Sequence, residues 1–375
     1  MEGDFIKIND WLLPLSWIYG AGVRLRNQMF EMGMLKSRSF DIPVISVGNI
    51  TVGGSGKTPH VEYLINLLRD KVKVAVLSRG YKRKSKGYML ATADTPMSDI
   101  GDEPYQMKKK FADIYVAVDK DRCHGIDQLT ANEETSDTDV ILLDDAYQHR
   151  YVKPGVNILL VDYHRLIMYD KLLPAGRLRE PQKGKARADI VIVSKCPAEL
   201  KPMEFRVITK AMNLFPYQKL YFTTLKYGSL RPIYGGEDRK LDTLTGDTSI
   251  LLLTGIASPQ QMIVDLKPYT ERITPLTFPD HHQYTDADID RINAEFEAMK
   301  GNDKMIVTTE KDNARLCGME GLSDEVKKNI YVLPVEVGFM LDQEEDFNEN
   351  IIGYVRKNSR NSILAKAKDD NKSDN

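Results

Sequence analysis

The sequence predicts an α/β protein built on a mostly parallel sheet, with a second, smaller α/β domain. Short apolar runs recur along the chain with helical stretches between them, a pattern typical of parallel α/β sheets. These runs are continuous rather than alternating, which indicates strands covered on both faces. A chain of 375 residues is also long enough to form two separate cores.

The first domain is expected over residues 41–225, between an N-terminal segment (1–40) and the second domain (226–345). Residues 346–375 are polar, and we expect a disordered tail. A glycine-containing stretch, Tyr227 to Gly236, is expected to connect the two domains. The strands predicted for the first domain are Pro43–Val47, Val72–Leu77, Ile114–Val118, Val140–Leu143, Val156–Val161, Ile190–Val193 and Leu220–Thr224.

The second domain contains a further set of apolar runs and one well-marked helix. The helix is expected from Asp286 to Met299, with Thr285 as its N-cap and Asp288 in its first turn. The strands predicted here are Ile250–Leu253, Ile273–Phe278, Met305–Val307 and Tyr331–Val335.

Composition excludes several classes of protein. The net charge of −2 provides no global basic field, so no nucleic-acid partner is expected. The three cysteines (Cys123, Cys196 and Cys317) lack paired spacing, so neither a disulfide framework nor a zinc site is indicated.

The N-terminal segment carries both tryptophans of the chain, Trp11 and Trp17, in an uncharged run too short and too broken to span a bilayer. Basic residues follow, among them Arg24 and Arg26. Aromatic anchors beside basic side chains are typical of a segment in a membrane interface. A helix packed on the protein's own core explains the pattern equally well.

A glycine-rich loop follows the first predicted strand and precedes a helical pattern, as in phosphate-binding loops (P-loops). Lys57 is expected to reach the β- and γ-phosphates of a nucleotide, and the Thr58 hydroxyl to bind Mg²⁺. The first position of the G-x-x-x-x-G-K-[ST] pattern is Thr51, so the loop is a variant. The expected nucleotide-binding residues are Thr51, Val52, Gly53, Gly54, Ser55, Gly56, Lys57 and Thr58.

Asp144 and Asp145 end the predicted strand Val140–Leu143, where a carboxylate holds Mg²⁺ in many P-loop enzymes. Paired aspartates are also common in surface turns. Together with the loop, they predict an enzyme that uses ATP and Mg²⁺. No Asn-Lys-x-Asp guanine motif is present, which disfavours a GTPase.

Two further segments offer groups for phosphoryl transfer. Asp102 lies in Gly101-Asp102-Glu103-Pro104, which suits either a base or an ordinary helix start. The basic stretch from Ser78 to Lys84 suits either a substrate phosphate or a solvated charge run. An ATPase that drives a partner, and a membrane-associated binding protein with a degenerate nucleotide site, remain as alternatives to a kinase.

Six motifs in order, SVGNITVGGSGKTP, SRGYKRKSKG, GDEPYQM, LDDAYQHR, LLPAGRLREP and FPDHHQY, resemble the tetraacyldisaccharide 4'-kinase family. The resemblance implies ATP-dependent phosphorylation of the 4'-hydroxyl of tetraacyldisaccharide 1-phosphate, an acylated glucosamine disaccharide phosphate, to form lipid IVA in lipid A biosynthesis. One departure from the family pattern is Ala146, where glycine is usual.

The resemblance also implies roles for individual residues. Asp102 is similar to the family's catalytic base, and His281 to the histidine that pairs with it. Asp144 and Asp145 correspond to the paired aspartates near Mg²⁺. The motifs that line the active-site cleft, and so are expected to bind the substrate, contain Arg79, Tyr81, Arg122, Gln148, His149, Arg179 and Glu180.

An acylated substrate favours the membrane interpretation of the N-terminal segment. The expected location is therefore peripheral, on the cytoplasmic face of the bacterial inner membrane, with no obligate protein partner implied. Because Asp102 falls in the first domain and His281 in the second, we expect the domains to close on ATP.

Overall fold

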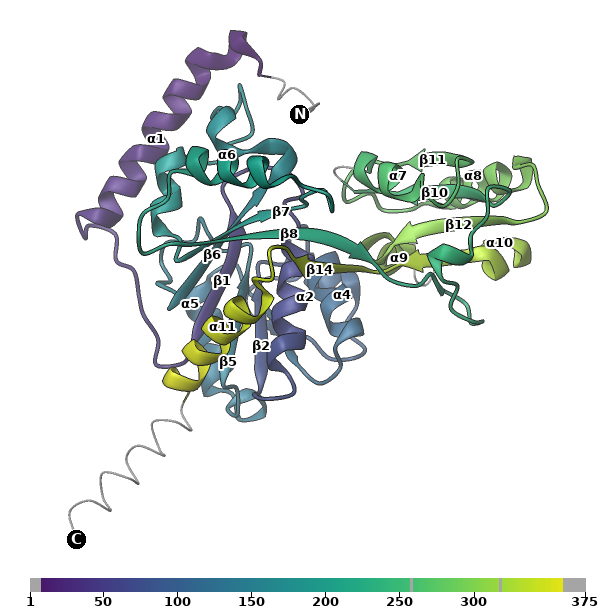
Figure 1. Cartoon of the computed structure of the whole chain (residues 1–375). Coiled ribbons are helices and arrows are strands. Elements are labelled where there is room, and N and C mark those ends of the chain that lie inside the picture. The colour runs from purple at the N-terminus through teal and green to yellow at the C-terminus, as the bar shows by residue number, and fades with distance from the viewer. Residues whose placement is uncertain (1–7, 257–258, 317–318, 360–375) are drawn as a thin grey trace. The chain divides into compact units, whose positions relative to one another are not determined.

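The computed structural model describes residues 8–256, 259–316 and 319–359 (Figure 1). The chain forms two compact units. The first unit comprises Met1–Ile100, Met107–Leu225 and Val337–Asn375, and the second comprises Gly101–Gln106 and Lys226–Glu336. The short segment Gly101–Gln106 therefore groups with the second unit, although its flanking sequence belongs to the first.

A nine-stranded sheet in the order β14-β8-β7-β6-β1-β5-β2-β4-β3 forms the centre of the first unit. Strand β1 lies between β5 and β6 and pairs with both in parallel. Each residue of β1, β2, β5 and β7 is buried, as expected for strands covered on both faces. The strands are β1 (Val44–Asn49), β2 (Val74–Ser78), β3 (Met89–Leu90), β4 (Tyr115–Val118), β5 (Val140–Asp144), β6 (Val156–Asp162), β7 (Ile190–Ser194), β8 (Lys219–Tyr227) and β14 (Val335–Phe339).

Helices cover this sheet, and α2 is the one that follows the glycine-rich loop (Figure 1). Leu64, Ile65 and Leu68 on one side of α2 are buried. Because they recur at helical spacing, one face of α2 packs on the sheet while its first turn stays beside the loop. The helices are α1 (Leu13–Glu31), α2 (Lys57–Leu68), α3 (Met97–Ile100), α4 (Asp102–Lys110), α5 (Arg122–Ala131), α6 (Pro202–Met212) and α11 (Glu344–Asn358), with short 3₁₀ turns at Asp10–Leu12, Glu133–Thr135, Tyr163–Arg165, Ile167–Tyr169 and Gln182–Arg187.

The second unit has its own five-stranded sheet in the order β11-β10-β12-β13-β9. Its helix α8 begins at the predicted cap, since the Thr285 hydroxyl and the Asp288 carboxylate each accept the other residue's backbone N–H. The elements are β9 (Arg231–Pro232), β10 (Ser249–Thr254), β11 (Ile273–Thr277), β12 (Lys304–Thr309), β13 (Ile330–Leu333), α7 (Gln260–Leu266), α8 (Asp286–Ala298), α9 (Glu310–Leu316) and α10 (Asp324–Asn329), with a 3₁₀ turn at Leu241–Thr243.

The predicted α/β class and each predicted strand are confirmed, with boundaries that differ by a few residues. Strand β8 extends into the stretch expected to be a connector, which also contributes β9. The expectation of a disordered tail from residue 346 is wrong as far as residue 358, because α11 occupies that stretch; residues 360–375 lie outside the described part. Phe347, Ile351 and Val355 recur every four residues, and this buried stripe stabilises the helix despite its polar composition.

Helix α11 should contribute substantially to the stability of the first unit. Phe347 is 2% exposed and packs against the rings of Tyr63, Tyr221 and Phe339. Phe347→Ala should lower the free energy of unfolding by about 3–5 kcal/mol, because a ring-sized cavity replaces these contacts. Calorimetric melting should show a clear drop in Tm, whereas Val207→Ala, at a half-exposed position, should leave it nearly unchanged. Equal melting of the two variants would contradict a structural role for α11.

Candidate functional site

The glycine-rich loop lies at the carboxyl end of β1, in the middle of the nine-stranded sheet. Residues 51–56 of the eight predicted nucleotide-binding positions form the loop, and the last two, Lys57 and Thr58, begin α2. Gly53 (φ 117°) and Gly56 (φ 79°) adopt left-handed backbone conformations that favour glycine. The loop backbone and the N-terminus of α2 therefore present N–H groups of the kind that bind phosphate.

Three polar side chains that the sequence analysis did not single out hold this loop in shape. Asn49 donates from Nδ2 to Ser55 Oγ at 2.7 Å, and Ser194 donates from Oγ to the Ser55 carbonyl at 2.9 Å. Lys195 Nζ donates to the Gly54 carbonyl and lies 3.1 Å from Asp162 Oδ2. Ser194 and Lys195 directly follow the predicted strand Ile190–Val193. Their position at the carboxyl edge of the sheet is the sequence signal that could have identified them as residues of the site.

His60, on the first turns of α2, connects the loop to β8. Its Nδ1 lies 2.7 Å from the Gly56 carbonyl and its Nε2 lies 3.0 Å from Thr223 Oγ1. Since a carbonyl only accepts, Nδ1 carries the hydrogen and Nε2 accepts from the threonine hydroxyl. Burial lowers the pKa of His60 to about 4, so a neutral imidazole makes both bonds.

Lys57 and Asp145 form the charged centre of the first unit, with Nζ 3.7 Å from Oδ1. Arg179 donates from Nη1 to Asp145 Oδ2 at 3.3 Å and to Gln148 Oε1 at 3.4 Å. Burial by itself raises the pKa of Asp145, but the charges of Lys57 and Arg179 lower it below its ordinary value. Asp145 also adopts φ 46°, an uncommon conformation outside glycine that is found at many functional sites.

Asp144 ends β5 in register with Val47 of β1, so it lies one strand away from the start of the loop. Its side chain is buried, and Ser78 donates from Oγ to its Oδ2 at 3.3 Å. The carboxylates of Asp144 and Asp145 and the hydroxyl of Thr58 are hard oxygen donors. This donor set fits Mg²⁺, which binds few protein oxygens and retains water.

The remaining predicted substrate-binding residues of the first unit fall into two groups. Gln148 donates from Nε2 to the Asn49 carbonyl at 2.5 Å and to Glu180 Oε1 at 3.1 Å, so it belongs to the Lys57 cluster. Arg122 is buried and donates to the backbone carbonyls of Asp119 and Asp144, which positions the end of β5. Arg122 therefore lies outside the Lys57 cluster, as do Arg79, Tyr81 and His149. Arg79 and Tyr81 follow β2 and are exposed. Burial lowers the pKa of His149 to about 4.

The second unit contains the predicted pair of Asp102 and His281. Asp102 is 7% exposed at the start of α4, and its Oδ2 lies 2.9 Å from His281 Nδ1. His281 adopts φ 60°, so both this residue and Asp145 hold uncommon backbone conformations. From the sequence we expect the pair to come from two domains, but Gly101–Gln106 groups with the second unit, so both residues belong to that unit.

Two cations from α9, which the sequence analysis missed, complete this cluster. Arg315 donates to Asp102 Oδ2 from Nη2 at 2.5 Å and from Nε at 3.2 Å. Lys311 Nζ lies 3.1 Å from Glu103 Oε1 and 3.9 Å from Asp102 Oδ2. Burial alone raises the pKa of Asp102, but His281, Lys311 and Arg315 together hold it well below its ordinary range. The carboxylate is therefore ionised at neutral pH.

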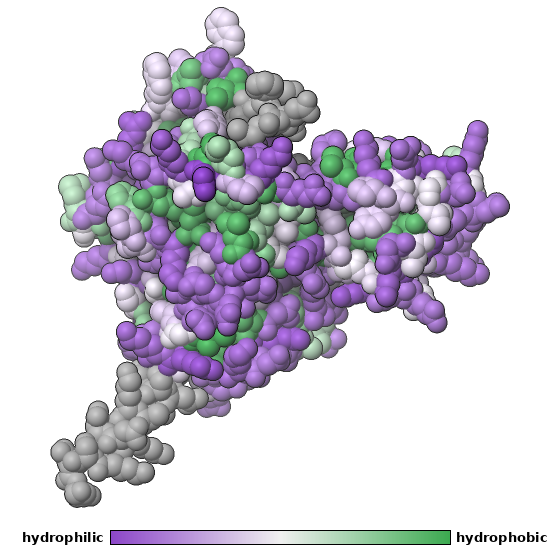
Figure 2. All heavy atoms as spheres, viewed as in Figure 1, coloured by the Kyte–Doolittle hydropathy of each residue, from purple (hydrophilic) through white to green (hydrophobic). Residues whose placement is uncertain are grey.

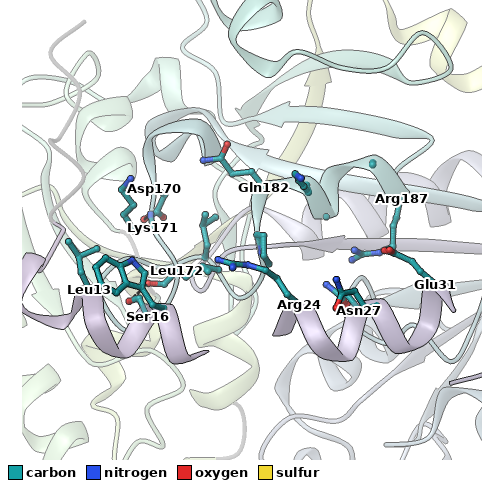
Figure 3. Close-up of a pocket in the computed structure, with 17 residues that line it drawn as sticks. Leu13, Ser16, Arg24, Asn27, Glu31, Asp170, Lys171, Leu172, Gln182 and Arg187 are labelled. Carbon is teal, nitrogen blue, oxygen red and sulfur yellow. Dashed lines mark hydrogen bonds between the residues drawn. The ribbon is translucent and has the colours of Figure 1, made fainter. Parts of the chain in front are cut away.

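A cavity of about 760 Å³ lies along α1 in the first unit (Figure 3). Arg24 and Asn27 on α1 line it on one side, and Lys171, Gln182 and Arg187 line it on the other. Cationic and amide side chains of this kind suit a ligand that combines phosphate with hydroxyl or amide groups.

The neutral state of His60 should make stability depend on pH. Because the folded pKa of about 4 lies below the unfolded value of 6.5, the unfolded state binds more protons between these values. Stability should therefore fall as the pH drops from 6.5 to 4, by up to about 1.4 kcal/mol per pH unit for this one group. Urea denaturation at pH 7 and pH 4.5 should show a smaller loss for His60→Gln than for the unaltered chain. An identical loss in both proteins would show that His60 is not buried in its neutral form.

The sequence model of the tetraacyldisaccharide-1-P 4'-kinase family matches residues 8–356. The chain is 61% identical to a tetraacyldisaccharide 4'-kinase of Phocaeicola vulgatus over 96% of its length and 99% of the relative's. It is 54% identical to one from Bacteroides fragilis over the full length of both. A crystal structure of LpxK from Aquifex aeolicus in complex with ATP is similar, with a TM-score of 0.68 and 31% identity over 92% of this chain and 98% of that one. The glycine-rich loop, the paired aspartates and these full-length matches together show that the chain belongs to the tetraacyldisaccharide-1-P 4'-kinase family.

Proposed function

We propose that this protein transfers the γ-phosphate of ATP to the 4'-hydroxyl of tetraacyldisaccharide 1-phosphate, the step that forms lipid IVA in lipid A biosynthesis. The observation that carries the proposal is the pairing of Lys57 with Asp145 beside Asp144, at the phosphate loop of a chain from this kinase family. Phosphoryl transfer depends mainly on positioning and on neutralising charge, and the two units contain groups suited to these tasks.

The first unit receives the nucleotide. The loop from Thr51 to Thr58 binds the phosphates through backbone N–H groups, and Lys57 binds the β- and γ-phosphates. Lys57 and Arg179 now pair with Asp145, so ATP phosphates of higher charge would compete for the same cations. Bound at Thr58, Asp144 and Asp145, Mg²⁺ would neutralise charge on the phosphate oxygens.

The second unit provides the base. Asp102 accepts the proton of the sugar 4'-hydroxyl, and His281, bonded to its Oδ2, holds the carboxylate in place. The hydroxyl oxygen then attacks the γ-phosphorus, the bond from that phosphorus to the bridging oxygen breaks, and ADP leaves. A carboxylate that is ionised at neutral pH is ready to accept this proton without prior deprotonation.

The acylated substrate brings the protein to a membrane, where we propose that α1 lies in the interface. Trp11 is 93% exposed and Trp17 67%, and Ile18 and Leu25 are also exposed along this segment. Figure 2 shows apolar residues at the end of the first unit where α1 begins. Among the described helices, none combines the length and apolar character that a membrane span requires. Because ATP is the donor, we place the protein on the cytoplasmic face of the inner membrane.

The cavity along α1 supports contact between the first unit and the polar part of the lipid. Arg24 lines it from α1, whose other residues would enter the interface, and Lys171 and Arg187 line it from the opposite side. A glucosamine disaccharide carries phosphate, hydroxyl and amide groups, which match these side chains in charge and in hydrogen-bonding capacity.

Transfer of label tests the proposed reaction. The purified protein, given γ-labelled ATP, Mg²⁺ and detergent-dispersed tetraacyldisaccharide 1-phosphate, should place label in the lipid. Asp102→Asn should lower kcat by about 10²–10⁴-fold, because general base catalysis contributes that much, while ATP binding stays near normal. Lys57→Ala should reduce both ATP binding and turnover. Consumption of ATP without labelled lipid would instead indicate an ATPase, and an active Asp102→Asn variant would remove Asp102 from the base role.

Membrane binding by this segment can be followed by tryptophan fluorescence, since the two tryptophans of the chain are Trp17 on α1 and Trp11 in the 3₁₀ turn before it. Vesicles of phosphatidylethanolamine and phosphatidylglycerol should shift their emission to the blue. Replacing exposed Ile18 and Leu25 by serine should weaken vesicle binding by roughly tenfold or more, because their apolar area no longer leaves water. Met203→Ser, at a similarly exposed position on α6, is the matched control. Emission that vesicles leave unchanged would argue against the interface role.

A further inference from the structure

We propose that Arg315 is the positioning residue of the Asp102–His281 pair, holding the Asp102 carboxylate in one orientation for the reaction. The inference rests on the proposed function, and it deepens that function by assigning a role to a side chain outside the motifs. All of the residues concerned belong to the second unit.

The guanidinium of Arg315 is inaccessible to solvent, and its N–H groups have hydrogen-bond acceptors on both sides. Its side chain is 0% exposed, and Nη2 and Nε both donate to Asp102 Oδ2. On the opposite side, Nη1 donates to Asp312 Oδ1 at 3.1 Å and to the Gly255 carbonyl at 2.9 Å. A planar fork held at both ends cannot rotate, so the position of Asp102 Oδ2 is fixed as well.

Asp312 anchors this fork to the sheet. Its Oδ2 accepts from the Gly255 backbone N–H at 2.9 Å and from Thr309 Oγ1 at 2.7 Å. Gly255 follows β10 and Thr309 ends β12, so the anchor joins two central strands of the second unit. The arginine is therefore positioned by rigid elements rather than by a loop.

The arrangement assigns different tasks to the two oxygens of Asp102. Oδ2 accepts from Arg315 and bonds to His281 Nδ1, and these contacts fill its hydrogen-bonding capacity. Among the described residues, Oδ1 has one hydrogen-bond partner, the Glu103 backbone N–H at 3.1 Å. Oδ1 is therefore the oxygen that takes the proton of the acceptor hydroxyl.

Arg315 has two opposed effects on catalysis, and their sizes decide which one dominates. Its charge weakens Asp102 as a base. Its fork fixes the carboxylate, and a misplacement of about 1 Å costs roughly 10²-fold in rate. Phosphoryl transfer depends little on base strength, because its transition state is loose and positioning predominates. Losing the fork should therefore slow the reaction even though the base becomes stronger.

Two variants separate orientation from folding. Arg315→Lys keeps the charge but lacks the fork, and should lower kcat about 100-fold with the KM for ATP unchanged within about twofold. The double variant R315M/D312N removes the guanidinium together with its anchoring carboxylate, which avoids leaving Asp312 buried and unpaired. Arg239→Met is the matched control, because Arg239 binds Asp303 through two bonds in the same unit and should leave kcat unchanged.

A double-mutant cycle distinguishes a role through Asp102 from a general structural role. In the Asp102→Asn background, where the base is already lost, Arg315→Lys should change kcat by less than about threefold. An equal 100-fold loss in both backgrounds would overturn the proposal, and so would an Arg315→Lys variant with normal kcat.

A titration without lipid separates this inference from the proposed function. The titratable or charged groups facing Asp102 are His281, Lys311 and Arg315, with Glu103, Asp280 and Asp312 behind them. Carboxyl ¹³C NMR, assigned by the signal that Asp102→Asn removes, should show Asp102 ionised down to acidic pH. In R315M/D312N its pKa should rise, and the acid limb of kcat should move to higher pH with it. An Asp102 titration unchanged in R315M/D312N would overturn the inference, whereas absence of lipid labelling by the unaltered protein would overturn the proposed function alone.

Discussion

A carboxylate shielded from water needs a neighbouring cation, and both polar clusters of this chain contain such a pair, with Asp102 buried and Asp145 31% exposed. Unpaired, such a charge costs several kcal/mol. In the first unit Asp145 is paired with Lys57 and Arg179, which remain partly exposed. In the second, Asp102 is paired with a guanidinium that solvent does not reach. The first pairing is partly open to solvent, and the second is closed to it on the side of the guanidinium.

The side chains that hold the glycine-rich loop are mostly uncharged. Neutral His60 bonds to the Gly56 carbonyl of the loop. Asn49 donates to the Ser55 hydroxyl, and Ser194 donates to the Ser55 carbonyl. Of these supporting side chains, Lys195 is the one that carries a charge. The others hold the loop by neutral hydrogen bonds. A loop held in this way can present its backbone N–H groups to phosphate while these supporting hydrogen bonds stay in place.

How much the sequence could predict depended on how local each feature is. The strands follow from continuous apolar runs, and the loop, Lys57 and Asp144 follow from short motifs at strand ends. His281 was assigned to Asp102 through the resemblance alone. Arg315 could not be found, because it lies 213 residues from Asp102 in sequence and only the fold brings them together. Arg122 was assigned to the cleft through the resemblance, but its side chain binds backbone carbonyls, which the sequence does not reveal. Helix α11 was missed because its buried stripe is thin within a polar stretch.

The assignment of Gly101–Gln106 to the second unit has a consequence for how this protein can be divided. The chain passes between the units at Ile100/Gly101, Gln106/Met107, Leu225/Lys226 and Glu336/Val337. A fragment cut at the last two junctions would contain Arg315 and His281 but not Asp102, and would leave a buried guanidinium without its carboxylate. Gene fusion at those two junctions would therefore separate Asp102 from His281 and Arg315.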